Sequence, residues 1–426
     1  MVNVALLGLG TVGSGVVNIL QDPEGRDPLL KEVNLVGVGV SSKTKPRPNS
    51  KIAPALLTED SFALVQNPSV EVVIEVVGTV DIPLKLIRAA LKAGKHVVTA
   101  NKALMARHGT ELLALAQSQG VHLRYEAAVG GGIPLIQPLH QCLGANRVSS
   151  LLGIVNGTTN YILTKMTQEG RSYASVLAEA QQLGYAEANP AADVEGYDAQ
   201  EKLAILASII FRNQLVPLDS IPRKGITGVT DVDIRYAAEL GYAIKLVAVA
   251  NRTKEGLLDL RVHPALVPYI HPLSKVDNAF NAVLIEADPL GQIMFYGPGA
   301  GAGPTASAVV SDLINILSVP DSPMDGGFTA TYPLLPIDDV ETRFYCRLKA
   351  KDHPGVIGQL GQAFGDSSVS LESIVQKAVH GPDQLAELVI IIHQVQTKRF
   401  NEAIQKIQKL SSITSVDLAL RVLGAG

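Results

Sequence analysis

Cysteine is scarce in this sequence of 426 residues, in which only Cys142 and Cys346 occur. Two thiols so far apart in the chain cannot form a disulfide framework, and their spacing is not that of a metal site. No two of the nine histidines stand four residues apart, so a zinc site of the His-x-x-x-His kind is not expected. The sparing use of cysteine favours a reducing compartment, and we expect a cytoplasmic protein.

Long apolar runs and an excess of positive charge are also missing. No run reaches the roughly 18–20 apolar residues that a membrane-spanning helix needs. The formal net charge is −4, which gives no basic footprint for nucleic acid. A first strand is expected from about Asn3, which leaves no room for the regions of a secretory signal. We therefore expect neither a membrane nor a nucleic acid as a partner.

What the sequence does contain is an alternation of short apolar segments and helix-like segments over its first 135 residues. Continuous apolar strands separated by helices predict a parallel sheet covered on both faces, which is an α/β architecture of the Rossmann type. The expected strands are 2–8, 33–40, 70–78, 96–100 and 121–129, and the expected helices include 83–94 and 111–120.

The rest of the chain has a different pattern. Helices are expected at 174–184, 199–210 and 305–317, with antiparallel strands at 257–267 and 282–288. Four prolines and two adjacent glycines in 318–340 indicate a linker. The last 85 or so residues have the order β-α-β-β-α-β, which predicts a separate small domain of the ferredoxin-like type.

A glycine motif, Gly8, Gly10 and Gly13, follows the first expected strand and opens the first expected helix. Glycines in that place allow a tight turn and let the backbone approach a pyrophosphate at the helix N-terminus. The context favours a dinucleotide site, although a tight turn in an apolar sequence would also use glycines.

The end of the second strand distinguishes between two dinucleotides. NAD sites usually place an acidic residue there to bind the ribose 2′-hydroxyl. This chain has Ser41, Ser42, Lys43, Lys45 and Arg47 and no carboxylate. Hydroxyls and cations suit a 2′-phosphate, so NADP is favoured and NAD remains possible; the alternative is that the lysines belong to a solvated loop.

Two further segments carry candidate catalytic residues. Lys102 comes just after a parallel strand, at the sheet edge where ligands bind in open α/β sheets. Asp198 and Lys202 stand four residues apart and share one face of an expected apolar helix. Near a cofactor such a pair can position a proton donor, and the carboxylates of Glu187 and Asp193 in the preceding loop could bind an ammonium group. An ordinary helix-capping loop with surface ion pairs is the alternative.

Two glycine-containing loops leave the choice between binding and structure open. Thr158, at a strand-to-helix junction, could help to bind a substrate carboxylate or could simply cap a helix. The segment 126–134 could present carbonyl groups to a hard cation beside Glu126, or it could be a sharp turn.

In order along the chain, the segments GLGTVG, TANKAL, YEAAVGGGIP, NGTTNYIL, LGYAEANPAADVEGYDAQEKLAIL and GPGAGAGPTASAV are found. As an ordered set they resemble homoserine dehydrogenase. That family reduces L-aspartate 4-semialdehyde to L-homoserine with NAD(P)H, on the route to threonine, methionine and isoleucine. The resemblance implies that the chain is such an oxidoreductase and forms a homodimer or homotetramer.

The resemblance also implies roles for individual residues. Lys202 would be the proton donor, with Asp198 contacting substrate beside it and Lys102 between cofactor and substrate. The substrate pocket would be formed by Glu187, which binds the amino group, with Asp193, Tyr185 and Thr158. The cofactor would contact Gly8, Gly10, Thr11, Val12, Gly13, Ser41, Lys43, Lys102, Gly184 and Gly301. A monovalent cation, sodium in the family, would be held by Glu126 and the carbonyls of Val129, Gly131 and Ile133. Ala192 is less polar than its counterpart in some relatives, which leaves the neighbouring substrate contacts open.

The C-terminal segment KDHPGVIGQLGQAF resembles the ligand loop and helix of an ACT domain. Because ACT domains commonly bind amino acids, threonine is the hypothetical effector, at Asp352 to Gly358. The implied domains are a Rossmann domain over 1–134 completed by 297–318, an α+β substrate-binding, catalytic and dimerisation domain over 135–296, a linker over 319–341 and an ACT regulatory domain over 342–426.

Two other functions fit the sequence less well. An aspartate-semialdehyde dehydrogenase needs a thiolate nucleophile, and neither Cys142 nor Cys346 has a base motif beside it. A non-catalytic sensor, in which a nucleotide module is fused to an ACT domain, would have no use for the pair Asp198 and Lys202.

Overall fold

The computed structural model describes residues 1–47, 52–212, 215–318, 331–380 and 385–424. The chain forms two compact units. The first comprises residues 1–149, 200–221 and 281–331, and the second comprises 150–199, 222–280 and 332–426. Most of the expected linker, 319–330, lies outside the described residues. Within the described residues, no helix is both long enough and apolar enough to cross a membrane.

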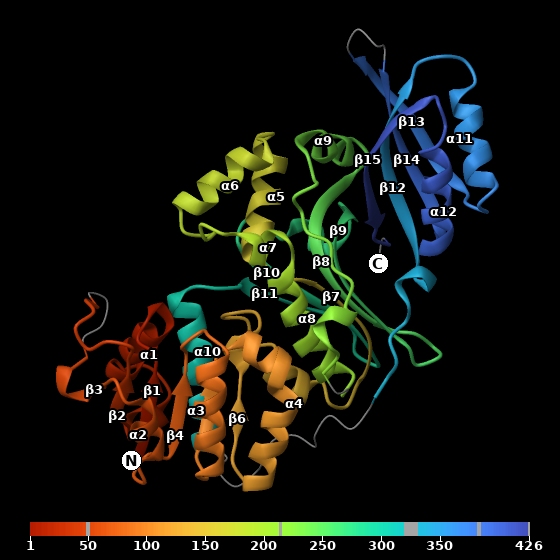
Figure 1. Cartoon of the computed structure of the whole chain (residues 1–426). Helices are drawn as coiled ribbons and strands as arrows, with labels where there is room; N and C mark the ends of the chain where they lie inside the picture. The colour runs from red at the N-terminus through yellow and green to blue at the C-terminus, as the bar shows by residue number, and fades with distance from the viewer. Residues whose placement is uncertain (48–51, 213–214, 319–330, 381–384, 425–426) are drawn as a thin grey trace. The chain divides into compact units, whose positions relative to one another are not determined.

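The first unit contains a six-stranded parallel sheet in the order β3-β2-β1-β4-β5-β6 (Figure 1). Its strands are β1 (Val2–Leu7), β2 (Val33–Gly39), β3 (Leu57–Thr58), β4 (Val72–Glu75), β5 (His96–Thr99) and β6 (Leu123–Arg124). This is the strand order of the Rossmann fold. Val4, Leu6 and Ile74 on its central strands are fully buried, as expected for a sheet covered on both faces. The prediction of a Rossmann-type parallel sheet is confirmed.

Helices α1 (Thr11–Gln21), α2 (Ser61–Gln66), α3 (Asp81–Lys92), α4 (Lys102–Gln119) and α10 (Ala302–Ser318) pack around this sheet. The two helices α1 and α10 approach closely because their contact residues are small. A Cβ atom on Gly15 would lie 2.8 Å from the carbonyl oxygen of Ala302 and 2.8 Å from the Cβ atom of Ala306. Residues late in the chain therefore complete the core of the first unit.

Two predicted elements of the first unit were wrong in extent. The strand expected at 121–129 is only Leu123–Arg124, and it is followed by a 3-10 turn, Glu126–Ala128. The turn forms because the Glu126 carboxylate accepts backbone N–H groups nine to eleven residues later, which pulls the chain back on itself. Helix α4 begins at Lys102 rather than 111, because the side chain of Asn101 accepts the N–H of Leu104 and caps the helix there.

The first unit also contains the strands β10 (Phe280–Asp288), all but its first residue, and β11 (Gly291–Pro298). Alternate residues of β11 are exposed, and Met294 and Tyr296 are among the large apolar side chains at the surface.

The second unit is a mixed sheet in the order β7-β8-β9-β15-β12-β14-β13. The first three strands are β7 (Arg147–Ile154), β8 (Tyr242–Arg252) and β9 (Leu258–Pro268), of which β8 and β9 form an antiparallel pair with eleven paired positions. Helices α5 (Gly157–Glu169), α6 (Tyr173–Gln182), α7 (Ala191–Val194), the first turn of α8 (Tyr197–Ile210) and α9 (Asp231–Glu239) belong to this unit.

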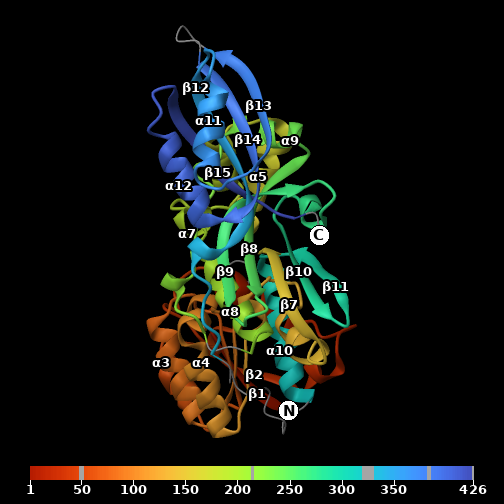
Figure 2. The same ribbon diagram turned by 90° about the vertical axis from the view of Figure 1, so that its right-hand side faces the viewer.

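The C-terminal part of the second unit has the predicted order β-α-β-β-α-β. It consists of β12 (Glu341–Lys351), α11 (Val356–Gly365), β13 (Leu371–His380), β14 (Leu385–Gln396), α12 (Thr397–Ile407) and β15 (Ile413–Val422). Figure 2 shows α11 and α12 on the same face of this sheet, where Leu360, Phe364 and Phe400 bury their side chains against β12 and β14. The ferredoxin-like prediction for this part is confirmed.

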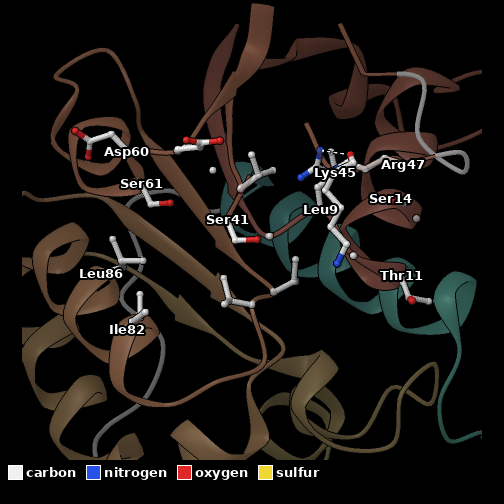
Figure 3. A pocket seen from close by; sticks show the side chains of 18 of the residues that line it. Leu9, Thr11, Ser14, Ser41, Lys45, Arg47, Asp60, Ser61, Ile82 and Leu86 are labelled. Carbon is white, nitrogen blue, oxygen red and sulfur yellow. Dashed lines mark hydrogen bonds between the residues drawn. The ribbon is translucent and has the colours of Figure 1, made fainter. Parts of the chain in front are cut away.

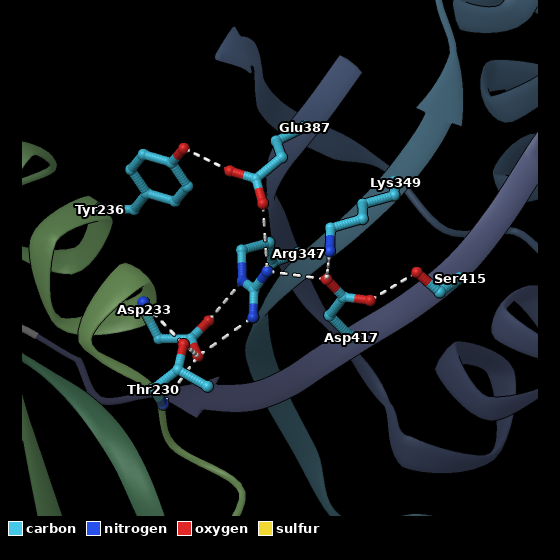
Figure 4. A network of polar contacts seen from close by, with 8 residues as sticks. All are labelled: Thr230, Asp233, Tyr236, Arg347, Lys349, Glu387, Ser415 and Asp417. Atoms are coloured by element: carbon cyan, nitrogen blue, oxygen red, sulfur yellow. Dashed lines mark hydrogen bonds and ion pairs between the residues drawn. The ribbon is translucent and has the colours of Figure 1, made fainter. Parts of the chain in front are cut away.

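The ferredoxin-like part is continuous with the rest of the second unit. β15 pairs in parallel with β9, so that Arg421 lies opposite Ala265. On the sheet face turned away from α11 and α12, the buried Arg347 of β12 forms ion pairs with Asp233 of α9 at 2.6 Å and with Asp417 at 2.7 Å (Figure 4). Tyr236 of α9 donates to Glu387 of β14 in the same network. Residues 332–335, which are part of the expected linker, form backbone hydrogen bonds with Leu258 of β9.

Candidate active site

The glycine turn between β1 and α1 has a geometry that only glycine allows at two of its positions. Gly8 has φ +100°, and a Cβ atom on it would lie 2.8 Å from the carbonyl oxygen of Val76. A Cβ atom on Gly13 would lie 2.2 Å from the carbonyl oxygen of Gly8. Gly10 is the N-cap of α1, and a Cβ atom on it would meet nothing within 4 Å. The backbone at the start of α1 is therefore left uncovered toward a neighbouring cleft.

That cleft has a volume of about 1290 Å³, and residues of the glycine turn form part of its wall (Figure 3). Gly8, Gly10 and Thr11 line it, and the opposite wall includes Ile82 and Leu86 of α3. Helix N-termini bind phosphate groups through their unpaired N–H groups and their dipole. The geometry thus fits a dinucleotide whose pyrophosphate lies against the start of α1.

The residues after β2 fit the 2′-phosphate side of the prediction only in part. Ser41, Lys45 and Arg47 line the cleft. The guanidinium of Arg47 is held in place by the carbonyl groups of Ser42, at 2.5 Å, and Lys45, at 2.8 Å. Lys43 is not among the lining residues, and its backbone N–H donates to Glu59 at 2.6 Å. The cations at this end of the cleft are therefore Lys45 and Arg47.

Of the other predicted cofactor residues, Val12 and Gly13 lie in the first turns of α1, and Gly301, with φ +126°, comes directly before α10. Gly184, with φ +77°, belongs to the second unit. None of these four lines the cleft as described.

At the carboxyl edge of β4 and β5, three polar side chains are connected. The buried Glu75 accepts the hydroxyl of Thr99 at 2.6 Å and the N–H of Val77 at 2.7 Å. Burial raises the pKa of Glu75. Asn101, the N-cap of α4, donates to the carbonyl of Thr79, and Lys102 follows it, half-buried, in the first turn.

Glu75 was not identified from the sequence. The available signal was one of two acidic residues, Glu71 and Glu75, within an otherwise apolar expected strand.

The carboxylate of Glu126 is engaged within the protein. One of its oxygens accepts the N–H groups of Leu135 at 2.6 Å and Ile136 at 2.8 Å, and the other accepts that of Gln137 at 2.8 Å. Its own N–H donates to Asp312 of α10 at 2.7 Å. Burial and the neighbouring Glu126 carboxylate raise the pKa of Asp312 to about 7.

The turn after Glu126 is tightly packed. A Cβ atom on Gly131 would lie 2.5 Å from the carbonyl of Gly299. Among the described residues, no group of three or more His, Cys, Asp or Glu side chains is arranged to hold a metal ion. The carboxylate of Glu126, which also accepts the N–H groups of residues 135–137, and the backbone carbonyls of Val129, Gly131 and Ile133 stay the predicted cation ligands at this turn.

In the second unit, Asn156 joins two of the predicted carboxylates. Its Nδ2 atom lies 2.7 Å from Asp193 and 2.9 Å from Asp198, and its Oδ1 accepts the N–H of Thr159 as the N-cap of α5. Both Asn156 and Asp198 are about 4% exposed. One amide therefore connects α5, α7 and α8, and two acidic side chains are held close together.

Thr158, in the first turn of α5, donates to the carbonyl of Tyr185 at 2.7 Å. The ring of Tyr185 packs against that of Tyr161, with centroids 4.9 Å apart. Tyr185 and Glu187 are both exposed, whereas Thr158 is buried. The structure thus connects Thr158 with the loop that carries Tyr185 and Glu187. Asn156 was overlooked in the sequence, although it stands immediately before the Gly-Thr-Thr segment.

Helix α8 carries both Asp198 and Lys202, four residues apart and each less than a tenth exposed. The boundary between the two units falls within this helix, after Ala199. The following residues Leu203, Leu206 and Ala207 are apolar and buried. Two charged side chains buried on one face of an apolar helix are costly unless they are paired or used, which makes them the strongest catalytic candidates.

Comparison with known proteins decides the family. Three family models match the chain: homoserine dehydrogenase, NAD binding domain, at residues 8–126; homoserine dehydrogenase at 134–314; and the ACT domain at 344–412. A homoserine dehydrogenase of Synechocystis sp. is 49% identical over 99% of both chains. The chain belongs to the homoserine dehydrogenase family.

Other relatives agree. A homoserine dehydrogenase of Bacillus subtilis is 41% identical over 100% of this chain and 99% of its own length. The crystal structure of a homoserine dehydrogenase from Thiobacillus denitrificans matches with a TM-score of 0.92 and 39% identity, covering 100% of this chain and 99% of that one.

A hyperthermophilic archaeal homoserine dehydrogenase in complex with NADPH matches with a TM-score of 0.62 and 27% identity, over 74% of this chain and 98% of its own. The resemblance read from the sequence is confirmed, and the chain is an NAD(P)-dependent oxidoreductase with a C-terminal ACT domain.

Proposed function

We propose that this chain reduces L-aspartate 4-semialdehyde to L-homoserine with NADPH. The observation that carries the proposal is the buried placement of Asp198 and Lys202 on one face of α8, with Asp198 held by Asn156. NADPH, when bound in the cleft of the first unit, supplies the hydride that reduces the aldehyde carbon. The remaining chemistry belongs to the side chains of the chain.

Lys202 donates a proton to the aldehyde oxygen as that oxygen gains negative charge. Its ammonium is suited to this because a buried cation also stabilises the developing alkoxide before the proton moves. Asp198, one helical turn earlier, orients the substrate beside it. Lys102, fixed at the start of α4 by the Asn101 cap, lies between cofactor and substrate and adds a second positive charge.

The substrate is an amino acid, so it presents an ammonium and a carboxylate at fixed distance from the reacting carbon. The carboxylates of Asp193 and Glu187 bind the ammonium, and Thr158 holds the loop that carries Tyr185 and Glu187 through its hydrogen bond to the carbonyl of Tyr185. The side-chain amide of Asn156 donates to one oxygen of Asp193 and to one oxygen of Asp198, so each carboxylate is held in position for its own role. Gly184 and Gly301 are the predicted residues that would lie on the nicotinamide side of a bound cofactor.

Preference for NADP over NAD follows from the residues after β2. Ser41, Lys45 and Arg47 line the cleft there, and a 2′-phosphate gains charge-assisted bonds from cations that a 2′-hydroxyl cannot use. Lys45→Gln should lower kcat/KM with NADP several-fold and leave that with NAD unchanged. Lys43→Gln is the matched control, and an equal loss in both variants would contradict this assignment.

Four further properties are part of the proposal. A monovalent cation, sodium, is bound by Glu126 and the carbonyls of Val129, Gly131 and Ile133. A homodimer or homotetramer forms, because β11 exposes Met294 and Tyr296 in a way that a second copy would cover. Threonine inhibits the enzyme through the ACT domain, at Asp352 to Gly358. The protein acts in the cytoplasm.

The test is a steady-state assay of L-homoserine oxidation with NADP and with NAD, each in the presence and absence of L-threonine. We expect turnover that is faster at low concentrations of NADP than of NAD, and inhibition by threonine. Absence of turnover with either cofactor would overturn the proposed reaction, whereas turnover without threonine inhibition would overturn only the regulatory part.

A further inference from the structure

A pocket of about 270 Å³ lies in the second unit, at the place where the ACT sheet joins β9. β15 pairs with β9 there, and residues 222–224 run along the same part of β9. The backbone N–H of Lys224 donates to the carbonyl of Val262, whose own N–H donates to the carbonyl of Pro222. Phe344 of β12 and Phe400 of α12 form an apolar wall, with their rings stacked at 3.9 Å between centroids. The pocket is thus built from three separate parts of the chain.

Positive charge dominates the lining of this pocket. Four cationic side chains line it, namely Arg223, Lys224, Arg261 and Arg421, and no carboxylate is among the described lining residues. The nearest ion pair is that of Arg261 with Asp259 on the same strand. The pocket therefore carries more positive charge than its own acidic neighbour balances.

The guanidinium groups are held in place but are not fully bonded. Arg421 donates to Thr397 at 3.0 Å and lies over the ring of Phe344, with its Cζ atom 5.1 Å from the centroid. Its Nη1 atom, like the Nε atom of Arg223, is buried and has no hydrogen-bond partner among the described residues. Buried donors without a protein partner are rare in native proteins, and they usually donate a hydrogen bond to a ligand, an ion or a water molecule.

The cations also repel one another. Burial, and then the charge of Arg261, lowers the pKa of Arg421 to about 10. Like charges brought together in an enclosed space are unfavourable in the free protein, and an anion between them removes that cost.

We propose that this pocket binds a small organic oxyanion, a carboxylate or phosphate that carries a short apolar body and no ammonium group. The cations bind the oxyanion and the two phenyl rings pack against the apolar body. An amino acid is disfavoured, because no acidic side chain among the described lining residues could receive its ammonium group.

This site differs from the proposed threonine site of the ACT domain. Phe344 and Lys351 stand near opposite ends of β12, roughly 23 Å apart at about 3.3 Å per residue, and the loop Asp352 to Gly358 follows Lys351. The pocket is therefore a second ligand site on the regulatory part of the chain.

The pocket is also connected to the segment before Asp198. Arg223 donates to the carbonyl of Glu195, and its guanidinium lies 3.4 Å from the ring centroid of Tyr197. A ligand that bonds to Arg223 changes how firmly this segment is held, so we expect the KM for homoserine to change more than kcat. This second effect rests on the proposed function, whereas binding itself does not.

The experiment measures the thermal unfolding of the full chain with saturating NADP, which fills the phosphate subsites of the first unit, at constant ionic strength. Inorganic phosphate and isobutyrate are titrated in parallel, so that the two arms distinguish phosphate from carboxylate ligands. We expect a saturable rise in Tm with at least one of them. Arg421→Gln and Lys224→Gln should each weaken the apparent affinity about tenfold, which one lost charge-assisted bond of ~1.4 kcal/mol corresponds to.

Lys254→Gln, which removes an exposed lysine outside the pocket, is the control and should bind as the unchanged chain does. The exposed Lys224 keeps the test decisive if Arg421→Gln fails to fold. The proposal is overturned if neither probe gives a saturable rise, or if Lys224→Gln and Lys254→Gln respond alike. It is also overturned if Lys224→Gln weakens the binding of L-threonine as much as it weakens the binding of the two anions.

Discussion

The glycine turn of the first unit and the polar cluster around Asn156 in the second unit are built in opposite ways. The turn works through absent side chains: a Cβ atom at Gly8 or Gly13 would collide with the backbone. The cluster works through side chains from three helices, joined by one amide. A backbone-built site is local in the sequence, whereas a side-chain cluster exists only once distant segments have packed.

The largest effect is expected at Lys202 of α8, four residues after Asp198. Lys202→Met keeps the length of the side chain but removes its charge, and kcat for homoserine oxidation should fall about 10²–10⁴-fold because the proton donor is lost. NADPH binding, followed by nucleotide fluorescence, should persist. Lys92→Met, at an exposed position of α3, is the control. Near-normal kcat in Lys202→Met would refute the role of Lys202 as the proton donor, although the chain would still be an active enzyme.

Two glycine substitutions within the turn separate folding from binding. Gly13→Ala should lower the free energy of unfolding by about 1–3 kcal/mol, since its Cβ atom has to displace the backbone of Gly8. Gly10→Ala meets no protein atom, so its unfolding free energy should change by about 1 kcal/mol at most. Gly10→Ala should nevertheless bind NADP more weakly, as measured by calorimetric titration. If both variants lost only stability, the turn would be structural.

Substitutions of Asn156 test the polar cluster in the same manner. Asn156→Ala loses the helix cap and should cost about 1 kcal/mol of stability. Asn156→Asp keeps a capping oxygen but places a third carboxylate beside Asp193 and Asp198, so the KM for homoserine should rise and Tm should fall more than in the alanine variant. Equal KM values in the two variants would show that the bonds to the carboxylates do not matter for substrate.

The smallest expected effect is a pH dependence from Glu75. Because burial raises its folded-state pKa, the protonated form is favoured in the native state, and its contribution to stability is present below pH 4.5 and lost as pH rises through the folded pKa. Glu75→Gln should remove that loss, so the difference in unfolding free energy between the variant and the unchanged chain should shift in favour of the variant as the pH rises above 4.5. The exposed Glu24→Gln should leave the profile unchanged.

The same contrast explains what could be predicted from the sequence. Most strands of the parallel sheet, the strands β9 and β10 and the glycine turn follow from local patterns, and the ACT elements have the predicted order, whereas β3, β8 and β11 were not predicted. The cap at Asn101, the bonds of Asn156 and the partners of Glu75 depend on which segments become neighbours, which local periodicity does not encode. The sequence alone does not show which of Lys43 and Lys45 faces the cleft. Lys45 lines it because the loop is bent by the hydrogen bonds of Arg47.

The parallel pairing of β15 with β9 bears on how the ACT domain could be gained or lost. A chain ending before β12 would leave an open edge on β9 and the buried carboxylate of Asp233 without Arg347. Open strand edges promote aggregation, and an unpaired buried charge is strongly destabilising. The ACT domain of this chain is thus not a detachable cassette, and a truncated form would need compensating changes at both places to stay soluble.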